Sequence, residues 1–136
     1  MLSKPIIIVS GEPNSIFFEI FFKTLKKNKF KKSIILIGSI PLLKLQMKKL
    51  NFKRKVNRIN ISNLKNYKLN NQSINIIDVP YNPIKAFEKI SIKSKNYIEN
   101  SFKIAFKIIN DGITDKLING PISKKSFLNK KFLGVT

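Results

Sequence analysis

The sequence contains no cysteine and no histidine. These absences exclude a disulfide framework, a thiolate nucleophile and an imidazole general base within its 136 residues. A metal site formed by this chain alone would have to use its seven carboxylates. Long apolar runs are also absent, and Ile6–Val9 is too short for a signal-peptide core or for the ~18 residues that cross a bilayer. We therefore expect a cytoplasmic protein with no targeting segment and no membrane contact.

Acidic residues are scarce as well: 27 Lys and Arg against 7 Asp and Glu give a formal net charge of +20. Such a charge is typical of nucleic-acid-binding proteins, because Lys and Arg displace counterions from phosphate backbones. Only Arg54 and Arg58 are arginine, however, and bidentate recognition of phosphate or guanine favours arginine. The lysines accompany many Ile and Asn residues, which is typical of an AT-rich coding sequence. We therefore interpret the charge as compositional and do not expect nucleic acid as the partner.

The length fits one domain, and 43% hydrophobic residues suffice for a packed core. Residues 4–10 predict a buried strand that ends at Gly11, and residues 15–27 predict a helix capped by Ser15. The helix residues expected to face inward are Ile16, Ile20, Phe21 and Leu25.

The following segment repeats this alternation. Residues 33–37 predict a second strand that ends at Gly38. Ser39 and Pro41 then predict the cap and first turn of a helix that reaches about Leu50. The order β-α-β-α predicts an α/β fold in which helices form layers on a sheet.

The second half continues with a short strand and loop within residues 51–73 and a strand over residues 74–79. Residues 94–110 predict a helix that Gly112 ends in a left-handed conformation. The apolar stripe expected on this helix comprises Tyr97, Ile98, Phe102, Ala105, Phe106 and Ile109.

Two glycine turns that follow predicted strands are candidate ligand-binding loops. Gly11-Glu12-Pro13 follows the first strand and precedes a helix N-terminus, where open α/β sheets bind anions and other ligands. Residues 116–118 predict a short strand that leads into Gly120-Pro121, and a helix is expected to start within residues 123–128. Lys124, near that helix start, could meet a phosphate or carboxylate as a point charge. Taken singly, Gly11-Glu12-Pro13 is weak evidence, and local chemistry favours an ordinary turn and a surface lysine for Gly120-Pro121 and Lys124.

Taken together and in order, the motifs carry more information. Gly-Glu-Pro-x-x-Ile-x-x-Glu spans Gly11 to Glu19, x-Gly-Pro-x-x-Lys spans Asn119 to Lys124, and Phe-x-Gly-x-Thr spans Phe132 to Thr136. This order resembles the N-terminal portion of the 4-hydroxythreonine-4-phosphate dehydrogenase family, NAD-dependent enzymes of pyridoxal phosphate biosynthesis. The resemblance covers essentially the whole chain.

The resemblance implies that residues 1–136 are one α/β region, an incomplete N-terminal fragment of a larger two-lobed fold like that of isocitrate and isopropylmalate dehydrogenases. It also implies a homodimer, NAD, and a divalent metal held by histidines, with oxidation and decarboxylation of a small phosphorylated substrate. The substrate contacts implied for this chain are Thr136, Val135 at the family's histidine position, and Lys124. Most NAD, metal and phosphate contacts of the family lie beyond residue 136, so we expect the isolated chain to be inactive and poorly soluble.

Departures from the family pattern leave alternatives open. Val135 cannot donate, accept or titrate as histidine does, and Phe17-Phe18 replaces the usual Gly-Pro. One alternative is a related dehydrogenase for another four-carbon phosphorylated hydroxy acid, and another is an inactive remnant. A small basic nucleic-acid-binding module is the alternative of a different class.

Overall fold

The chain folds around one parallel sheet. The computed structural model describes residues 4–66, 69–81 and 92–122. In chain order the elements are β1 (Ile6–Val9), α1 (Phe17–Lys27), β2 (Ile34–Gly38), α2 (Ile40–Lys49), β3 (Lys55–Arg58), the 3₁₀ helix η1 (Ile61–Asn66), β4 (Ser73–Asp78), α3 (Ile92–Asn110) and β5 (Leu117–Asn119). These strands and α-helices match predicted ones, with boundaries that differ by at most two residues, and the helix predicted to start within residues 123–128 lies outside the described residues.

The strand order is β3-β4-β2-β1-β5, and every pairing is parallel. β1 lies between β2 and β5: Ile8 is paired with Leu36 on one side and with Ile118 on the other. β2, β3 and β4 follow β1 in the chain and all lie on one side of it in the sheet. α3 then leads to β5, which lies on the opposite side of β1. β1 is therefore a topological switch point, the position at which open α/β sheets bind ligands.

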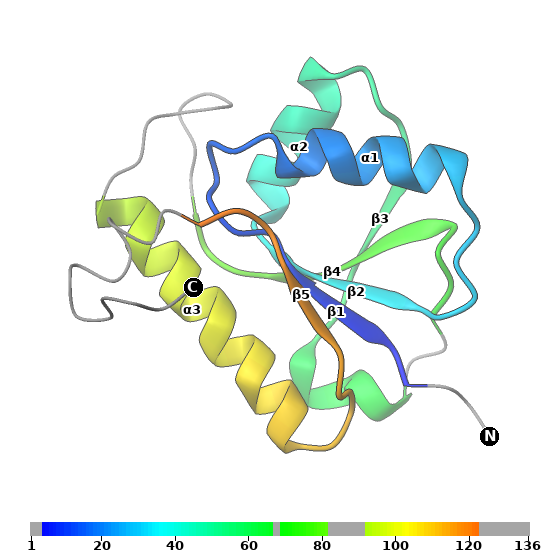
Figure 1. Ribbon diagram of the computed structural model, residues 1–136, viewed down its shortest axis with the longest axis vertical. Coiled ribbons are helices and arrows are strands. Elements are labelled where there is room, and N and C mark those ends of the chain that lie inside the picture. The colour runs from blue at the N-terminus through cyan, green and yellow to red at the C-terminus, as the bar shows by residue number, and fades with distance from the viewer. Residues whose placement is uncertain (1–3, 67–68, 82–91, 123–136) are drawn as a thin grey trace.

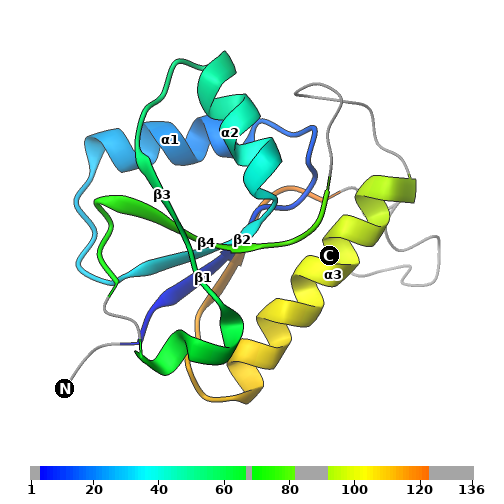
Figure 2. The same ribbon diagram turned by 180° about the vertical axis from the view of Figure 1, so that it is seen from behind.

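The helices cover both faces of this sheet. α1 and α2 lie on one face and α3 lies on the other, as the two opposite views show (Figures 1 and 2). The strands between them are buried apolar runs, and Ile7, Leu36 and Ile76 are each 0% exposed. The predicted α/β/α layering is confirmed. Within the described ranges, no helix has both the length and the apolar character that crossing a membrane requires.

The inward face of α1 differs from the prediction. Ile16 and Ile20, expected to be buried, are 57% and 51% exposed. The residues that α1 buries are Phe18, Phe21, Phe22 and Leu25. Apolar residues surround the first turns of this helix, and burying three phenylalanine rings removes more apolar surface from water than burying two isoleucines. The predicted cap is also wrong, since the N-cap is Ile16 and the Ser15 hydroxyl instead accepts a 3.3 Å hydrogen bond from the Phe17 N–H.

The sequence predicted α3 more closely. The predicted stripe residues that are at most 1% exposed are Tyr97, Ile98 and Ala105. Ile108 is buried in place of Ile109, and Phe106 is 53% exposed, contrary to the prediction. The helix ends as predicted: Gly112 has φ +76° and its N–H bonds the Ile109 carbonyl at 3.0 Å.

Candidate functional site

Polar residues gather where the strands end. Ser10 follows β1, Ser39 follows β2, Asp78 ends β4 and Gly120 follows β5. Because the strands are parallel, all four residues lie at the same edge of the sheet, which we call the carboxyl edge. This edge includes the switch point beside β1 and is the candidate site.

The two glycine turns singled out in the sequence contact each other at this edge. The Glu12 N–H donates to the Pro121 carbonyl at 2.7 Å, and the Gly120 N–H donates to the Val9 carbonyl at 2.7 Å. Gly11 has φ +79°, and a Cβ there would lie 2.4 Å from the Pro121 oxygen. A Cβ on Gly120 would lie 2.2 Å from the Ser10 carbonyl oxygen. Both positions therefore require glycine, because the two backbones cross within van der Waals distance.

The hydroxyl of Tyr97 ties α3 to the same edge from the other face. It lies 2.8 Å from the Ser10 Oγ and accepts a 2.9 Å hydrogen bond from the Ser39 N–H. A Cβ on Gly38 would lie 3.0 Å from this hydroxyl, so the absence of a side chain there admits the tyrosine. Burial raises the pKa of Tyr97 to about 12, against the opposing effect of its hydrogen bonds to Ser10 and Ser39. Tyr97 is thus a neutral, positioned group that sets the spacing of β1, β2 and α3.

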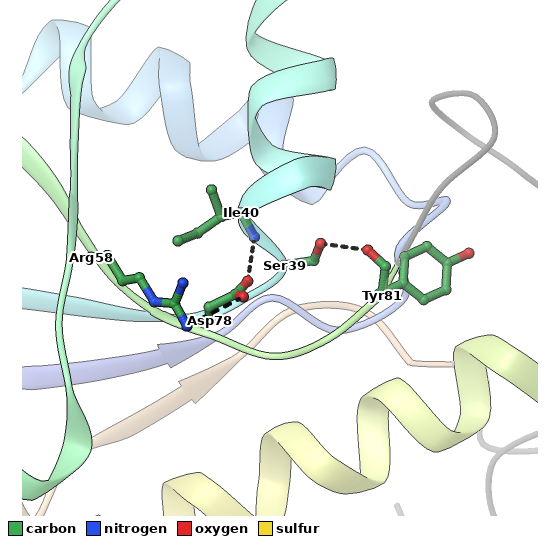
Figure 3. A network of polar contacts seen from close by, with 5 residues as sticks. All are labelled: Ser39, Ile40, Arg58, Asp78 and Tyr81. Carbon is green, nitrogen blue, oxygen red and sulfur yellow. Dashed lines mark hydrogen bonds and ion pairs between the residues drawn. The ribbon is translucent and has the colours of Figure 1, made fainter.

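A second polar network fixes the start of α2 (Figure 3). The Ser39 hydroxyl accepts from the Leu42 N–H at 3.2 Å and donates to the Tyr81 carbonyl at 2.9 Å. Asp78 Oδ1 accepts from the Ile40 N–H at 2.9 Å, and Oδ2 lies 4.0 Å from the exposed Arg58 guanidinium. Two side chains therefore satisfy N–H groups of the first turn of α2, as the cap predicted at Ser39 requires.

The turn after β1 also contains two buried residues, Glu12 and Pro13. Glu12 is 7% exposed although it is a carboxylate, and Pro13 is also buried. Gln46 reaches from α2 with its Nε2 3.2 Å from the Pro13 carbonyl, while its buried Oε1 has no hydrogen-bond partner among the described residues. The turn after β1 is therefore held from both α2 and the turn after β5.

The described side chains at the carboxyl edge are mostly hydrogen-bond acceptors or hydroxyls. Glu12 and Asp78 supply carboxylates, and Ser10 and Ser39 supply hydroxyls. These carboxylates do not form a metal site, since no group of three or more His, Cys, Asp or Glu lies together in residues 4–66, 69–81 and 92–122. Ser10, Ser39 and Asp78 already form hydrogen bonds within the chain, and this part of the edge does not fit a divalent metal.

The structure describes some of the predicted site residues and not others. The structure brings together Gly11, Glu12, Pro13, Gly120 and Pro121. Lys124, Val135 and Thr136 lie outside the described residues. Sequence reasoning missed the roles of Ser10, Asp78 and the Tyr97 hydroxyl, although a polar residue at the end of an apolar strand is a signal that could have indicated the first two.

Three solved structures share this fold, whereas neither the protein-family models nor the curated proteins include a match to the sequence. A structure described as a 4-hydroxythreonine-4-phosphate dehydrogenase from Salmonella typhimurium superposes with a TM-score of 0.78 over 98% of this chain and 43% of its own. The enzyme of that name from Burkholderia phymatum gives 0.78 over 99% and 42%, and that from Klebsiella pneumoniae gives 0.74 over 93% and 40%. Each is 19% identical in sequence. The chain thus has the fold of these dehydrogenases and spans about two fifths of their length, and they belong to the family that its end motifs resemble.

Proposed function

We propose that this chain is the N-terminal part of an NAD-dependent dehydrogenase that oxidises and decarboxylates a phosphorylated hydroxy amino acid, as 4-hydroxythreonine-4-phosphate dehydrogenases do. The observation that carries the proposal is that 93–99% of the chain superposes on the solved structures of these dehydrogenases, with TM-scores of 0.74–0.78. The contact between the turns after β1 and β5 supports it, because two of the three motifs of the resemblance meet at the switch point.

In this proposal the carboxyl edge forms one wall of the substrate site. Gly11, Gly120 and Pro121 shape the wall through their backbones, and the Tyr97 hydroxyl fixes its distance from α3. Lys124 would neutralise substrate phosphate, and Thr136 would hydrogen-bond the substrate beside Val135. When bound, NAD would accept the hydride, and other parts of the complete protein would hold both NAD and the metal ion.

The complete protein is proposed to be a cytoplasmic homodimer. In a two-lobed enzyme a second lobe would close over the carboxyl edge and exclude water from the reacting groups, which strengthens electrostatic interactions there. The isolated 136 residues are proposed to be inactive, because the described part contains no group of three or more His, Cys, Asp or Glu to hold a metal that would stabilise developing negative charge.

The experiment begins with the complete reading frame at the source locus. The encoded protein is assayed for NADH formation at 340 nm with 4-phosphohydroxy-threonine and, separately, with other phosphorylated four-carbon hydroxy acids. Turnover of the first substrate supports the proposal, and turnover of only the others indicates a related dehydrogenase. A folded protein that turns over none of them contradicts it.

A pair of variants then tests the proposed wall. Val135→His restores the side chain that the resemblance places there, and we expect kcat/KM for 4-phosphohydroxy-threonine to rise by about tenfold, the value of one added polar contact of ~1.4 kcal/mol. Val135→Ala is the matched control, since it removes the same valine without adding a hydrogen-bonding group. Equal effects of the two variants would show that residue 135 does not contact the substrate.

A further inference from the structure

Ten of the twenty described Lys and Arg residues lie at the edge of the sheet opposite the candidate site. This amino edge comprises the end of α1, the segments that lead into the strands and the first residue of β3, and Figure 1 shows the loop between α1 and β2 at the end of the sheet away from the turn after β1. Its cationic residues are Lys4, Lys26, Lys27, Lys29, Lys31, Lys32, Lys53, Arg54, Lys55 and Lys116. Asp111 and Asp115, both in the segment before β5, are the carboxylates in the described parts of the segments that lead into the strands.

This edge contains a hollow of about 500 Å³. Lys26, Lys27 and Lys29 line it at the end of α1, and Gln72 lines it from the approach to β4. Arg54 forms its floor: its guanidinium donates to the Asn71 carbonyl at 2.9 Å and to the Leu25 carbonyl at 3.4 Å. The hollow is therefore basic, and its arginine is held by backbone groups.

An aromatic ring also lines this hollow. Phe30 is 38% exposed, and lysines precede and follow it in the loop between α1 and β2. The Asn71 side chain pins the loop: its Nδ2 donates to the Lys32 carbonyl at 2.8 Å and to the Phe30 carbonyl at 3.4 Å, and its Oδ1 accepts from the Ile34 N–H at 3.0 Å. The phenylalanine is thus presented to solvent on a fixed backbone rather than buried in the core.

The positive surface extends from the hollow toward β1 and β5. Lys116, immediately before β5, lowers the pKa of Lys32 by a side-chain hydrogen bond and by charge repulsion, and Asp115 opposes this effect. Two ammonium groups held this close repel each other, and an anion placed beside them would relieve the repulsion. The hollow and the Lys32–Lys116 pair both lie at the amino ends of the strands.

We propose that the amino edge binds single-stranded nucleic acid, with a base stacked on Phe30 and phosphates bound by Lys26, Lys27 and Lys29. Single-strand-binding surfaces combine a cationic groove with exposed aromatic rings in this way. An acidic protein or an anionic membrane would use the lysines but would not require a fixed aromatic ring between them. The structure therefore revises the compositional interpretation of the lysines, and the binding is separate from the site at the carboxyl edge.

The test measures binding of the full chain to a fluorescein-labelled twelve-nucleotide oligo(U) by fluorescence anisotropy between 50 and 200 mM salt. The triple variant Lys26→Gln, Lys27→Gln and Lys29→Gln should lower the slope of log K against log salt by about 2, as expected for three lost phosphate contacts on a single strand. Its matched control carries Lys23→Gln, Lys44→Gln and Lys103→Gln, which remove the same charge from exposed positions elsewhere on the helices. That control should change the slope much less.

The aromatic contribution is tested separately. Phe30→Leu should weaken oligo(U) binding by about fivefold or more, because stacking of a base on an aromatic ring is lost, whereas Phe30→Tyr should retain the affinity. Neither change should alter binding to heparin, which carries negative charge but no bases. Circular dichroism and thermal unfolding confirm that each variant is folded.

Three results would overturn the proposal. The first is no binding of oligo(U) at 50 mM salt. The second is an equal loss of affinity in the two triple variants, which would mean that the total charge and not the amino edge attracts the oligonucleotide. The third is an unchanged affinity in Phe30→Leu, which would mean that no base stacks on this ring.

Discussion

Replacing Tyr97 by phenylalanine removes one oxygen atom from the junction of β1, β2 and α3. The ring of Tyr97 is 1% exposed, so the phenylalanine ring can take its place without a change in packing. The Ser39 N–H would lose its 2.9 Å acceptor and the Ser10 hydroxyl its 2.8 Å partner. The variant therefore isolates the polar contribution of this junction to stability.

The expected magnitude follows from these two orphaned groups. A buried donor or acceptor that loses its partner costs about 1–3 kcal/mol. The Ser10 hydroxyl can rotate toward another acceptor, whereas the backbone N–H of Ser39 cannot, so we expect the free energy of unfolding to fall by about 2–4 kcal/mol. For a chain of this size that corresponds to a decrease in Tm of roughly 6–12 °C.

The assay is urea unfolding followed by circular dichroism at 222 nm, with Ser10→Ala and the double variant measured alongside. In the double variant no serine hydroxyl remains to be orphaned, so its loss of stability should be smaller than the sum of the two single losses by about 1 kcal/mol. A loss below 0.5 kcal/mol in Tyr97→Phe, or strict additivity in the cycle, would refute the role assigned to the hydroxyl.

Alkaline pH provides an independent measurement on the same residue. The pKa of Tyr97 is raised to about 12 in the folded chain, against about 10 when unfolded. Between these values the unfolded state releases a proton that the folded state retains, so stability present below pH 10 is lost as the pH rises toward 12. The loss due to Tyr97 is about 3 kcal/mol, and it should be absent from Tyr97→Phe, while lysine titration affects both proteins alike. Parallel stability curves for the two proteins above pH 10 would contradict the burial of an ionisable hydroxyl.

The remaining predictions use matched pairs of residues. Gly11→Ala should destabilise the fold by about 3 kcal/mol or more, because its Cβ would lie 2.4 Å from the Pro121 oxygen at φ +79°, whereas Gly112→Ala at φ +76° has open space around it and should cost only about 1–2 kcal/mol. Equal losses in thermal unfolding would argue against the crossing of the two turns. Asp78→Ala should cost about 1–2 kcal/mol, since it orphans the Ile40 N–H at the start of α2, whereas Arg58→Gln should cost under about 0.5 kcal/mol, because an exposed ion pair at 4.0 Å contributes little. If the two variants unfold at the same urea concentration, the ion pair and not the helix cap is the main contribution of Asp78.

Most strands could be predicted because a strand that is buried on both faces consists almost entirely of apolar residues. Ile6–Val9 and Ile34–Gly38 are apolar and mostly β-branched runs ended by glycine or serine, which is the pattern of a strand buried on both faces. The orientation of α1 could not be predicted in the same way. Its first turns are apolar on nearly every side, so periodicity alone does not distinguish a face containing Ile16 and Ile20 from one containing Phe18 and Phe22.

The candidate site could be predicted only in part. Glycine turns after strands indicated the carboxyl edge, but the pairing of β1 with β5, separated by more than 100 residues, decides that Gly11 and Gly120 touch. The hydroxyl of Tyr97 was hidden within an apolar stripe, since a buried tyrosine has the same periodicity as a phenylalanine. Its partners, Ser10 and Ser39, lie on different strands, and no local pattern connects them to residue 97.

The position of β1 between β2 and β5 also has a consequence for the order in which the chain can be assembled on the ribosome. β1 is the first strand to be synthesised, yet one of its edges is completed only by β5, and about 80 residues separate Gly38 from Asn119. At roughly 5–20 residues per second, the emerging polypeptide spends about 4–16 s with that edge open to other nascent chains and to chaperones. A strand made of four consecutive branched apolar residues is a template for intermolecular pairing during that interval. We therefore expect nascent chains that end before Leu117–Asn119 to associate with chaperones until β5 has been made.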